Sequence, residues 1–306
     1  MMILQRHKHS AGWSIRWIRC CLLLTSLLGA TFASAPSRRR PALLSRKRSK
    51  AADTRTEDHA AVSFLFDSQR TSTKPLDGVS QLPTTRVRHL AEPFVNVVQH
   101  NDDDDEMIID LPQLLSACRN FAQAMVDVGQ SLSARDMRKN IAKAERFYSS
   151  SEAASKLRSM RDILQLEHKT DVHSYDGAQL IRLGEESCAM GLLWIRRSLH
   201  FQYLMFQQLL KGLDPDSGAQ FAYENSLRDF HGRILQKVYT VGLKSSSGSN
   251  RAWLAQIGGY DEDSFSREQH EATRQDLKFL VGVWGPLLAQ WESIYRDLNI
   301  NEKRRV

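Results

Sequence analysis

The amino-acid sequence predicts an all-α protein, and two features of its second part support this. From residue 107 onward, apolar residues recur every three or four positions over long stretches with few proline or glycine residues, as one face of a helix requires. No stretch alternates apolar and polar residues for long enough to indicate a sheet. Residues 107–306 have the size of one domain, so we expect a single helical domain there.

The first 35 residues are typical of a secretory signal peptide. Four basic residues precede a short apolar stretch at 20–28, and Ala33-Ser34-Ala35 forms a small-residue cleavage motif. The apolar stretch is shorter than the roughly 20 residues that a membrane-spanning helix needs, so a retained anchor is the weaker interpretation. We therefore expect entry into the secretory pathway. An artefact of the gene model at this end would instead leave the protein cytosolic.

Residues 36–106 are expected to form a disordered linker. Residues 37–55 are rich in arginine, lysine and serine and hold one acid, Asp53, a composition that resembles an organellar transit peptide. After a signal peptide, such a stretch would fit import into a secondary plastid, although basic disordered tails have the same composition. The acidic run 102–106 is expected to be solvated rather than to bind calcium, because no EF-hand spacing follows it.

In the second part, each helix follows from the spacing of its apolar residues. The first is expected to end before Gly129, and the last to be interrupted near Gly285-Pro286. The helix expected at 178–211 is apolar nearly all round, so other elements must cover it on more than one side. The expected helices are 111–128, 134–149, 153–168, 178–211, 218–243, 253–257 and 266–298.

Charge and cysteine content restrict the class of protein. The formal net charge is +7, but residues 107–306 hold 26 basic and 24 acidic residues, so the excess lies mostly in the N-terminal part. A nucleic-acid-binding domain would carry clustered basic residues, and we expect no nucleic-acid partner. Cys20 and Cys21 lie in the expected signal peptide. Cys118 and Cys188 remain, too few for a disulfide framework, and are expected to be buried free thiols.

Signatures of catalysis are missing from the sequence. It contains no nucleophile elbow Gly-x-Ser-x-Gly, no His-Glu-x-x-His, no glycine-rich phosphate loop and no Cys-x-x-Cys. His168 and His173 are five residues apart, which does not place them on one helical face as a metal pair. We therefore expect a protein that is not an enzyme and that holds neither a cofactor nor a metal.

Three polar residues of different chemistry share one stripe of the second expected helix. Asp136, Asn140 and Lys143 stand at i, i+4 and i+7, at the margin of the buried face. A carboxylate, a carboxamide and an ammonium group together suit a ligand rich in hydroxyls and amides. By itself the stripe would also fit a solvated helix face, because these residue types are common there.

Two aromatic residues are further candidates for ligand contacts. Trp194 lies on the helix that is apolar all round, where its ring would pack in the core or form a platform for a sugar ring or an amide. His231 has apolar neighbours at helical spacing and would be either a satisfied core histidine or a buried donor to a ligand carbonyl.

Taken together, three separated motifs resemble the glycolipid transfer protein family, in order and in spacing. They are Asp136-x3-Asn140-Ile-x-Lys143-x4-Tyr148, Gly191-Leu-Leu-Trp194-Ile-Arg-Arg-Ser-Leu and Ala222-Tyr223-Glu-Asn-Ser-Leu227-x2-Phe230-His231-Gly232. The resemblance covers residues 108–300. It implies a two-layer all-α sandwich that encloses the ceramide hydrocarbon, in a carrier that moves lipid between membranes.

The same resemblance implies a role for each residue at the lipid headgroup. Asp136 and Asn140 would bond sugar hydroxyls, and Asp136 would also accept the ceramide amide N–H. Lys143 would add a donor, Trp194 would stack on the first sugar, and His231 would donate to the amide carbonyl. The implied partners are a glycosphingolipid and, transiently, a membrane surface, with the protein acting as a peripheral monomer.

The headgroup class depends on a few positions. The phosphate-binding branch of the family has Lys where Asn140 stands and Arg at the positions of Met190 and Trp194, so the sequence favours a sugar headgroup. The alternatives are ceramide 1-phosphate transfer and a membrane-tethered sphingolipid sensor that does not shuttle. The sugar branch often has Trp two residues after the His, where this chain has Arg233, a possible membrane contact through anionic lipid.

Overall fold

The computed structural model describes residues 84–101, 106–150, 152–175, 181–243 and 248–305, which all belong to one compact unit. The expected signal peptide and the linker up to residue 83 lie outside the described residues, as does the acidic run 102–105, so these assignments stay predictions. Within the described part, most residues are helical, which confirms the all-α class. No helix of this part is long and apolar enough to cross a membrane.

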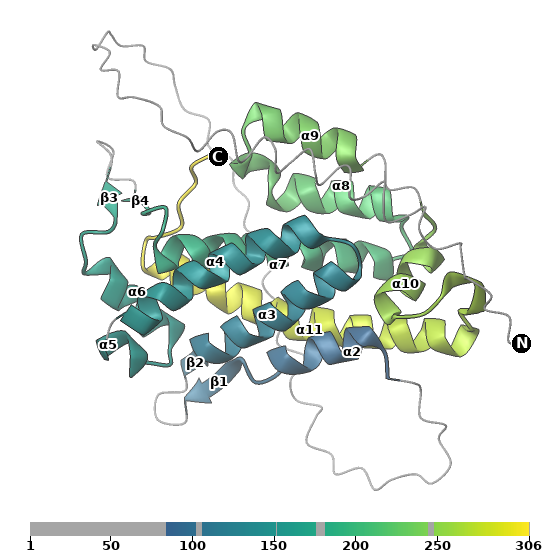
Figure 1. The fold of residues 1–306 in the computed structure, drawn as a ribbon, viewed down its shortest axis with the longest axis horizontal. Coiled ribbons are helices and arrows are strands. Elements are labelled where there is room, and N and C mark those ends of the chain that lie inside the picture. Colours follow the sequence, from purple (N-terminus) through teal and green to yellow (C-terminus); the bar gives the residue numbers. More distant parts are fainter. Residues whose placement is uncertain (1–83, 102–105, 151, 176–180, 244–247, 306) are drawn as a thin grey trace, which may run out of the picture. The chain divides into compact units, whose positions relative to one another are not determined.

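The elements follow the chain in a simple order (Figure 1). In the part of the chain that the structure describes, two short antiparallel strand pairs accompany the helices; in the first, Val98 pairs with Ile109 and Asn101 with Glu106. The bounds are α2 (Arg86–Ala91), η1 (Glu92–Phe94), β1 (Val98–Asn101), β2 (Glu106–Ile109), α3 (Leu111–Asp127), α4 (Ser131–Ser150), α5 (Glu152–Ser155), α6 (Met160–His168), β3 (Ser174–Tyr175), β4 (Ile181–Arg182), α7 (Cys188–Leu210), α8 (Pro215–Ser226), η2 (Arg228–Phe230), α9 (Arg233–Leu243), α10 (Asn250–Gly258), η3 (Glu262–Ser264) and α11 (Arg267–Asp297).

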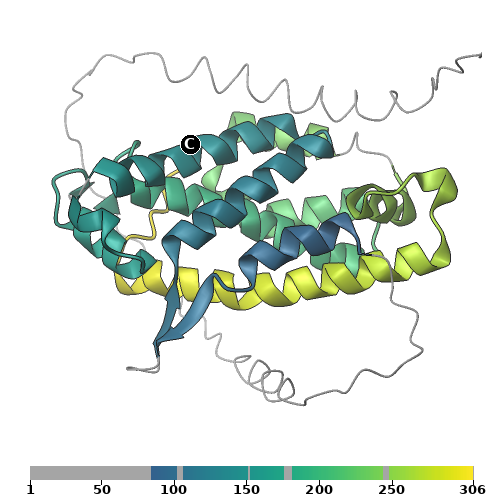
Figure 2. The same cartoon turned by 60° about the horizontal axis from the view of Figure 1, so that its bottom comes forward.

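Helix α7 is the centre of the fold. It packs against α4, α8 and α11, and α9 packs on α8 (Figures 1 and 2). This arrangement confirms that the helix which is apolar all round is covered on several sides, since burial of its apolar surface needs more than one partner. Helix α11 contributes Trp284, Trp291 and Tyr295 to the core, and all three are fully buried. Cys118 and Cys188 are buried free thiols, as expected.

The folded part begins earlier than the sequence predicted. Residues 86–101 were assigned to the linker, yet Val87, Ala91 and Phe94 are buried, and the Phe94 ring meets Trp284 edge-on at 5.5 Å. The boundary at residue 107 was therefore placed too late. The physical reason is that α2 is only six residues long, too short for its apolar spacing to stand out among the charged residues around it.

Four expected helices differ in the structure, three in where they begin or end and one in its continuity. The region 153–168 splits into α5 and α6, and 218–243 splits into α8 and α9 around His231-Gly232. The helix expected from 178 begins at Cys188, because the buried carboxylate of Glu167 accepts the N–H groups of Cys188 and Ala189 at 2.6 and 2.8 Å. Helix α11 runs through Pro286 without interruption. Pro286 lacks an N–H group and crowds the carbonyl four residues earlier, but burial of Trp284, Leu287 and Trp291 on both sides of it outweighs this local cost.

The closest approach between α4 and α7 occurs at Gly191. A Cβ atom on this residue would lie 2.5 Å from the Asn140 carbonyl oxygen and 3.0 Å from Cβ of Lys143. Real Cβ atoms do not tolerate such distances, so only glycine lets the two helices cross here. Because Asn140 and Lys143 are candidate site residues, this crossing sets their position relative to α7.

The first prediction compares two glycine substitutions. Gly191→Ala should lower the free energy of unfolding by about 1–3 kcal/mol, because the added methyl group must push α4 away from α7. Gly282→Ala is the matched control, since a Cβ on this exposed residue of α11 meets nothing within 4 Å, and should leave stability unchanged or raise it by up to about 1 kcal/mol. Chemical denaturation measures both. A Gly191→Ala protein as stable as the wild type would contradict the assigned contact.

Candidate functional site

The three polar residues of α4 lie where the sequence placed them, in graded exposure along one stripe. Asp136 is exposed, Lys143 is half-buried and Asn140 is buried. The amide nitrogen Nδ2 of Asn140 donates to the Asp136 backbone oxygen at 3.1 Å and lies 3.4 Å from Oδ2 of its carboxylate. Asn140 therefore contacts one oxygen of the Asp136 carboxylate, and the other oxygen, Oδ1, can accept a hydrogen bond from a ligand.

The Asp136 carboxylate is solvent-accessible yet has protein on several sides. This crowding raises the pKa of Asp136 by desolvation, while the positive charges of Lys139 and Lys143 oppose the rise. A carboxylate in such a concave setting gains more from hydrogen bonds to a ligand than a fully hydrated one does, because part of its hydration is already lost.

Trp194 and His231 meet face to face. Trp194 lies one helical turn beyond Gly191 on α7, and His231 lies in the short connection between η2 and α9. Their ring centroids are 6.3 Å apart and their planes differ by 19°. His231 is buried and Trp194 is half-buried, so part of the indole surface remains available to a flat group.

His231 is held in one protonation state by its neighbours. Burial lowers the pKa of His231 to about 4, and the nearby positive charge of Arg197 adds to the effect, so the imidazole is neutral at neutral pH. Its Nδ1 lies 3.3 Å from the hydroxyl of Tyr223, and burial raises the pKa of Tyr223 to about 12. Tyr223 keeps its proton, and in the tautomer in which it donates to Nδ1, Nε2 is the N–H donor of the ring.

Tyr223 is a site residue that sequence reasoning missed as a functional group. The sequence placed it on the helix before His231, at a spacing of eight residues, but did not indicate that their side chains would bond. Tyr239 of α9 stacks on the Tyr223 ring with centroids 4.6 Å apart and planes nearly parallel, at 5°. Together the two tyrosines fix the orientation of His231.

Arg197 supports the Trp194 ring from the protein side. Its guanidinium carbon lies 4.9 Å from the Trp194 ring centroid and 3.5 Å from that of Phe230, and the group donates to the backbone oxygen of Glu302. Burial, aided by Arg196, lowers the pKa of Arg197 to about 9. The C-terminal residues 299–305 thus pass beside α7 (Figure 1) and line a small hollow. The hollow is lined by Met190, Leu193, Trp194, Arg197, Glu302 and Arg304.

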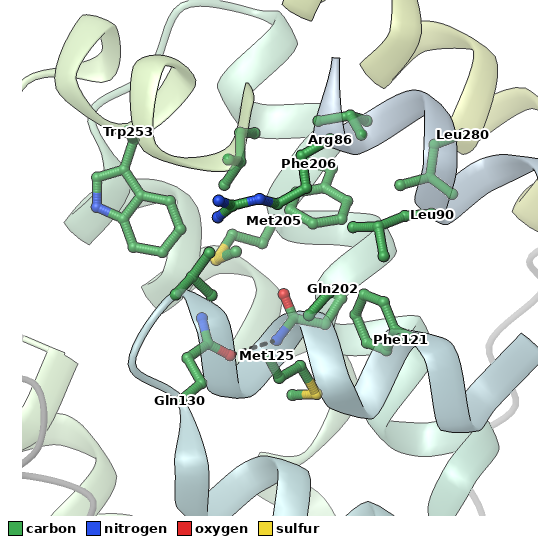
Figure 3. Close-up of a pocket in the computed structure, with 14 residues that line it drawn as sticks. Arg86, Leu90, Phe121, Met125, Gln130, Gln202, Met205, Phe206, Trp253 and Leu280 are labelled. Carbon is green, nitrogen blue, oxygen red and sulfur yellow. Dashed lines mark hydrogen bonds between the residues drawn. The ribbon is translucent and has the colours of Figure 1, made fainter. Parts of the chain in front are cut away.

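A second, mostly apolar cavity lies further along α7 (Figure 3). It has room for the centre of a water-sized molecule over about 30 Å³ and is partly open to solvent. The sequence predicted a hydrocarbon pocket without locating it, because its walls come from α2, α3, α7, α10, α11 and the turn after α3. The lining residues are Arg86, Val87, Leu90, Phe121, Ala124, Met125, Val128, Gln130, Gln202, Met205, Phe206, Trp253, Ile257 and Leu280.

The structure brings the three sequence motifs together through α7. Asn140 meets α7 at Gly191, Trp194 follows one turn later, and Trp194 stacks on His231. Arg233 lies at the outer edge of this group, exposed at the first position of α9. The arrangement offers a carboxylate, amide and ammonium donors, a flat ring and an imidazole N–H, which together can bind a neutral polyhydroxylated group with an adjoining amide.

Known proteins resemble this chain in sequence and in fold. The family model described as "Glycolipid transfer protein (GLTP)" matches residues 109–256. The glycolipid transfer protein of Danio rerio is 28% identical over 115 residues, covering 35% of this chain and 50% of that protein. The pleckstrin homology domain-containing family A member 8 of Danio rerio is 23% identical over 115 residues, covering 37% and 21%. The chain thus spans half the length of the first relative and about a fifth of the second.

A plant relative matches over more of its length. Glycolipid transfer protein 1 of Arabidopsis thaliana is 23% identical over 201 residues, which cover 62% of this chain and 93% of the relative. The alignment therefore takes in nearly all of a protein that consists of little besides this domain.

Solved structures share the fold. A structure showing how FAPP2 selects simple glycosphingolipids with the GLTP fold superposes with a TM-score of 0.54 and 20% identity, covering 74% of this chain and 98% of that one. Human ceramide-1-phosphate transfer protein in complex with 12:0 ceramide-1-phosphate superposes with a TM-score of 0.55 and 13% identity, covering 72% and 100%. The described helices, the three ordered motifs and the family match lead to one conclusion: residues 109–256 match the glycolipid transfer protein family, whose members are lipid transfer proteins, and the described part shares its fold.

Proposed function

We propose that this protein carries a glycosphingolipid from one membrane to another without changing it chemically. One observation supports this more than any other: the Trp194 ring, stacked on neutral His231, lies one helical turn from the crossing that positions Asn140 and, through it, the Asp136 carboxylate. This set of groups recognises hydroxyls and an amide by hydrogen bonding and stacking, and it contains no nucleophile activated by a base.

Each site residue has a role in this proposal. Asp136 and Asn140 bond sugar hydroxyls, and Asp136 also accepts the amide N–H of the ceramide. Trp194 stacks on the first sugar ring with the part of its ring that remains accessible. His231 donates its Nε2 proton to the amide carbonyl, since Tyr223 occupies Nδ1. Lys143 supplies a further donor to the sugar.

The headgroup decides which lipid is selected. A hydrocarbon chain that leaves a bilayer for an apolar pocket exchanges one apolar medium for another, so its methylene groups, each worth about 0.8 kcal/mol against water, contribute little net free energy. A buried polar group left without a partner costs about 1–3 kcal/mol. Differences in hydrogen bonding at the headgroup therefore dominate the differences between lipids.

The cations near Trp194 favour a sugar over a phosphate. Arg197 is buried beneath the Trp194 and Phe230 rings and already donates to a backbone oxygen. Arg304 is paired with the carboxylates of Glu185 and Glu302. A phosphate monoester needs several free charged donors to offset its loss of hydration, and each of these two guanidinium groups already donates to a protein oxygen.

Membrane contact is proposed at the start of α9. Arg233 is exposed, and Ile234 beside it is the most exposed large apolar side chain of the described part, at 65%. Lys237, one turn further, is also exposed. An apolar residue flanked by basic ones suits a surface that contains anionic lipid, because the charges attract the headgroups while the apolar side chain enters between them.

A lipid transfer assay tests the headgroup. With fluorescent lipids moving between vesicles, we expect transfer of galactosylceramide or glucosylceramide and none of ceramide 1-phosphate, because a sugar meets matched donors and acceptors at this site. Trp194→Ala should lower the sugar-lipid rate about tenfold by removing the stacking surface, while Tyr175→Ala, a change at an exposed residue of β3, should not. Transfer of ceramide 1-phosphate alone would exclude the sugar assignment.

The lowered pKa of His231 predicts a pH dependence of stability. The folded-state pKa of His231, about 4, lies below the ordinary value of 6.5. The contribution of the neutral imidazole to the free energy of unfolding is therefore complete above pH 6.5 and is lost as the pH falls toward 4. His231→Gln keeps an N–H donor but cannot titrate. The melting temperature of the wild type should therefore fall more steeply than that of the variant between pH 6.5 and 4. Parallel curves in this window would contradict the assigned environment.

Arg233→Ala tests the membrane contact. Removing one surface charge should weaken binding to vesicles with anionic lipid about fivefold, as about 1 kcal/mol per basic residue implies, and should leave binding to neutral vesicles unchanged. Arg267→Ala, at an exposed residue on α11, serves as the control. Unchanged affinity of the Arg233 variant for anionic vesicles in a sedimentation assay would place the contact elsewhere.

A further inference from the structure

The apolar cavity beside α7 contains two polar side chains that a hydrocarbon chain does not require. Gln130 and Gln202 are each only 5% exposed, and both line the cavity. Apart from these two and Arg86 at one side, every lining residue is apolar. Figure 3 shows both carboxamides reaching the cavity from neighbouring walls.

The fold holds both glutamines in place. Gly129 ends α3 with a positive φ of 83°, and the next residue, Gln130, donates its backbone N–H to the Met125 oxygen at 2.7 Å. The backbone oxygen of Gln130 then accepts the N–H of Ala134 at 3.0 Å as α4 begins. Gln202 lies within α7, between cavity residues at the centre of the fold. The backbone position of both glutamines is therefore set by the fold.

The two carboxamides bond to each other at only one atom each. Nε2 of Gln202 donates to Oε1 of Gln130 across a long distance of 3.5 Å. Nε2 of Gln130 and Oε1 of Gln202 have no partner among the described residues, and both point toward the cavity in Figure 3. If both amides were turned over, the outward atoms would still be one donor and one acceptor. The pair therefore presents a matched donor and acceptor to the cavity.

We propose that Gln130 and Gln202 recognise a hydroxyl group on the hydrocarbon chain of the bound lipid, a proposal that rests on the lipid-carrier function above. A hydroxyl is the simplest group that accepts one hydrogen bond and donates another. It would accept from Nε2 of Gln130 and donate to Oε1 of Gln202. A carboxylate, although attracted by Arg86, only accepts hydrogen bonds and would face the Gln202 oxygen with another oxygen.

The position of the pair assigns the hydroxyl to the middle of a chain. Gln202 follows Trp194 by eight residues on the same helix, a rise of about 12 Å. The headgroup is proposed to stack on Trp194, so a group that reaches Gln202 lies well along the chain. The proposed hydroxyl is therefore distinct from the hydroxyls of the headgroup and from those next to the ceramide amide.

A competition experiment on the full chain tests the proposal. Vesicles would contain equal amounts of two galactosylceramides that differ only in a hydroxyl near the middle of the acyl chain, and the lipid bound to the protein would be quantified by mass spectrometry. The wild type should be enriched in the hydroxylated lipid about fivefold or more, because the plain chain leaves both glutamine atoms unpaired.

A double variant separates recognition from structure. Gln130→Met with Gln202→Met removes both partners at similar size, so the fold should be as stable as before in thermal unfolding, and the plain lipid should bind at least as well. The ratio of hydroxylated to plain lipid bound by this variant should fall to one. Gln208→Met is the matched control, since Gln208 is equally buried on α7 but does not line the cavity, and should keep the preference.

The outcomes are distinct. Equal binding of the two lipids by the wild type, or a preference that survives in the double variant, would overturn the proposal while leaving the carrier function intact. Binding of neither lipid would overturn the proposed function and this inference together.

Discussion

The close crossing of α4 and α7 at Gly191 is the contact on which the candidate site depends. Without a side chain there, the Asn140 carbonyl and the Lys143 side chain come within reach of the α7 backbone. The next turn of α7 then carries Trp194, and Trp194 meets His231 from a third segment. A displacement of α4 would separate the carboxylate of Asp136 from the aromatic pair. The glycine at position 191 thus fixes the relative position of groups that belong to three separate motifs.

Burial decides what the grouped side chains can do. His231 is a neutral donor because it is desolvated and faces Arg197, and Tyr223 remains a protonated phenol for the same reason. Arg197 is held beneath two rings by a backbone oxygen from the C-terminal segment. These groups are therefore fixed before any ligand arrives, which reduces the cost of ordering them on binding. The same environment that makes His231 a good donor makes the fold sensitive to acid.

Local patterns in the sequence were sufficient for part of this picture. Apolar periodicity predicted α3, α4 and the buried α7, and the motif residues Asp136, Asn140, Trp194 and His231 meet in one region of the structure. What local patterns did not contain were contacts between distant segments. The pairing of Arg197 with Glu302 spans 105 residues, and the docking of α2 depends on α11 far away in the chain. The start of α7 was misplaced for a similar reason, since its first N–H groups are satisfied by Glu167 on another helix.

Selectivity in a lipid carrier can arise at two places with different physics. At the headgroup, many polar groups compete with water, and each added bond gives a small net gain. In the hydrocarbon cavity the exchange with the bilayer is nearly neutral in free energy, so a single unmatched donor or acceptor carries more weight there. The carboxamides of Gln130 and Gln202 stand in that second environment, where they penalise a plain chain and favour a chain with one hydroxyl. A cavity wall that holds a few polar side chains can therefore discriminate between chains that a uniformly apolar wall would accept equally.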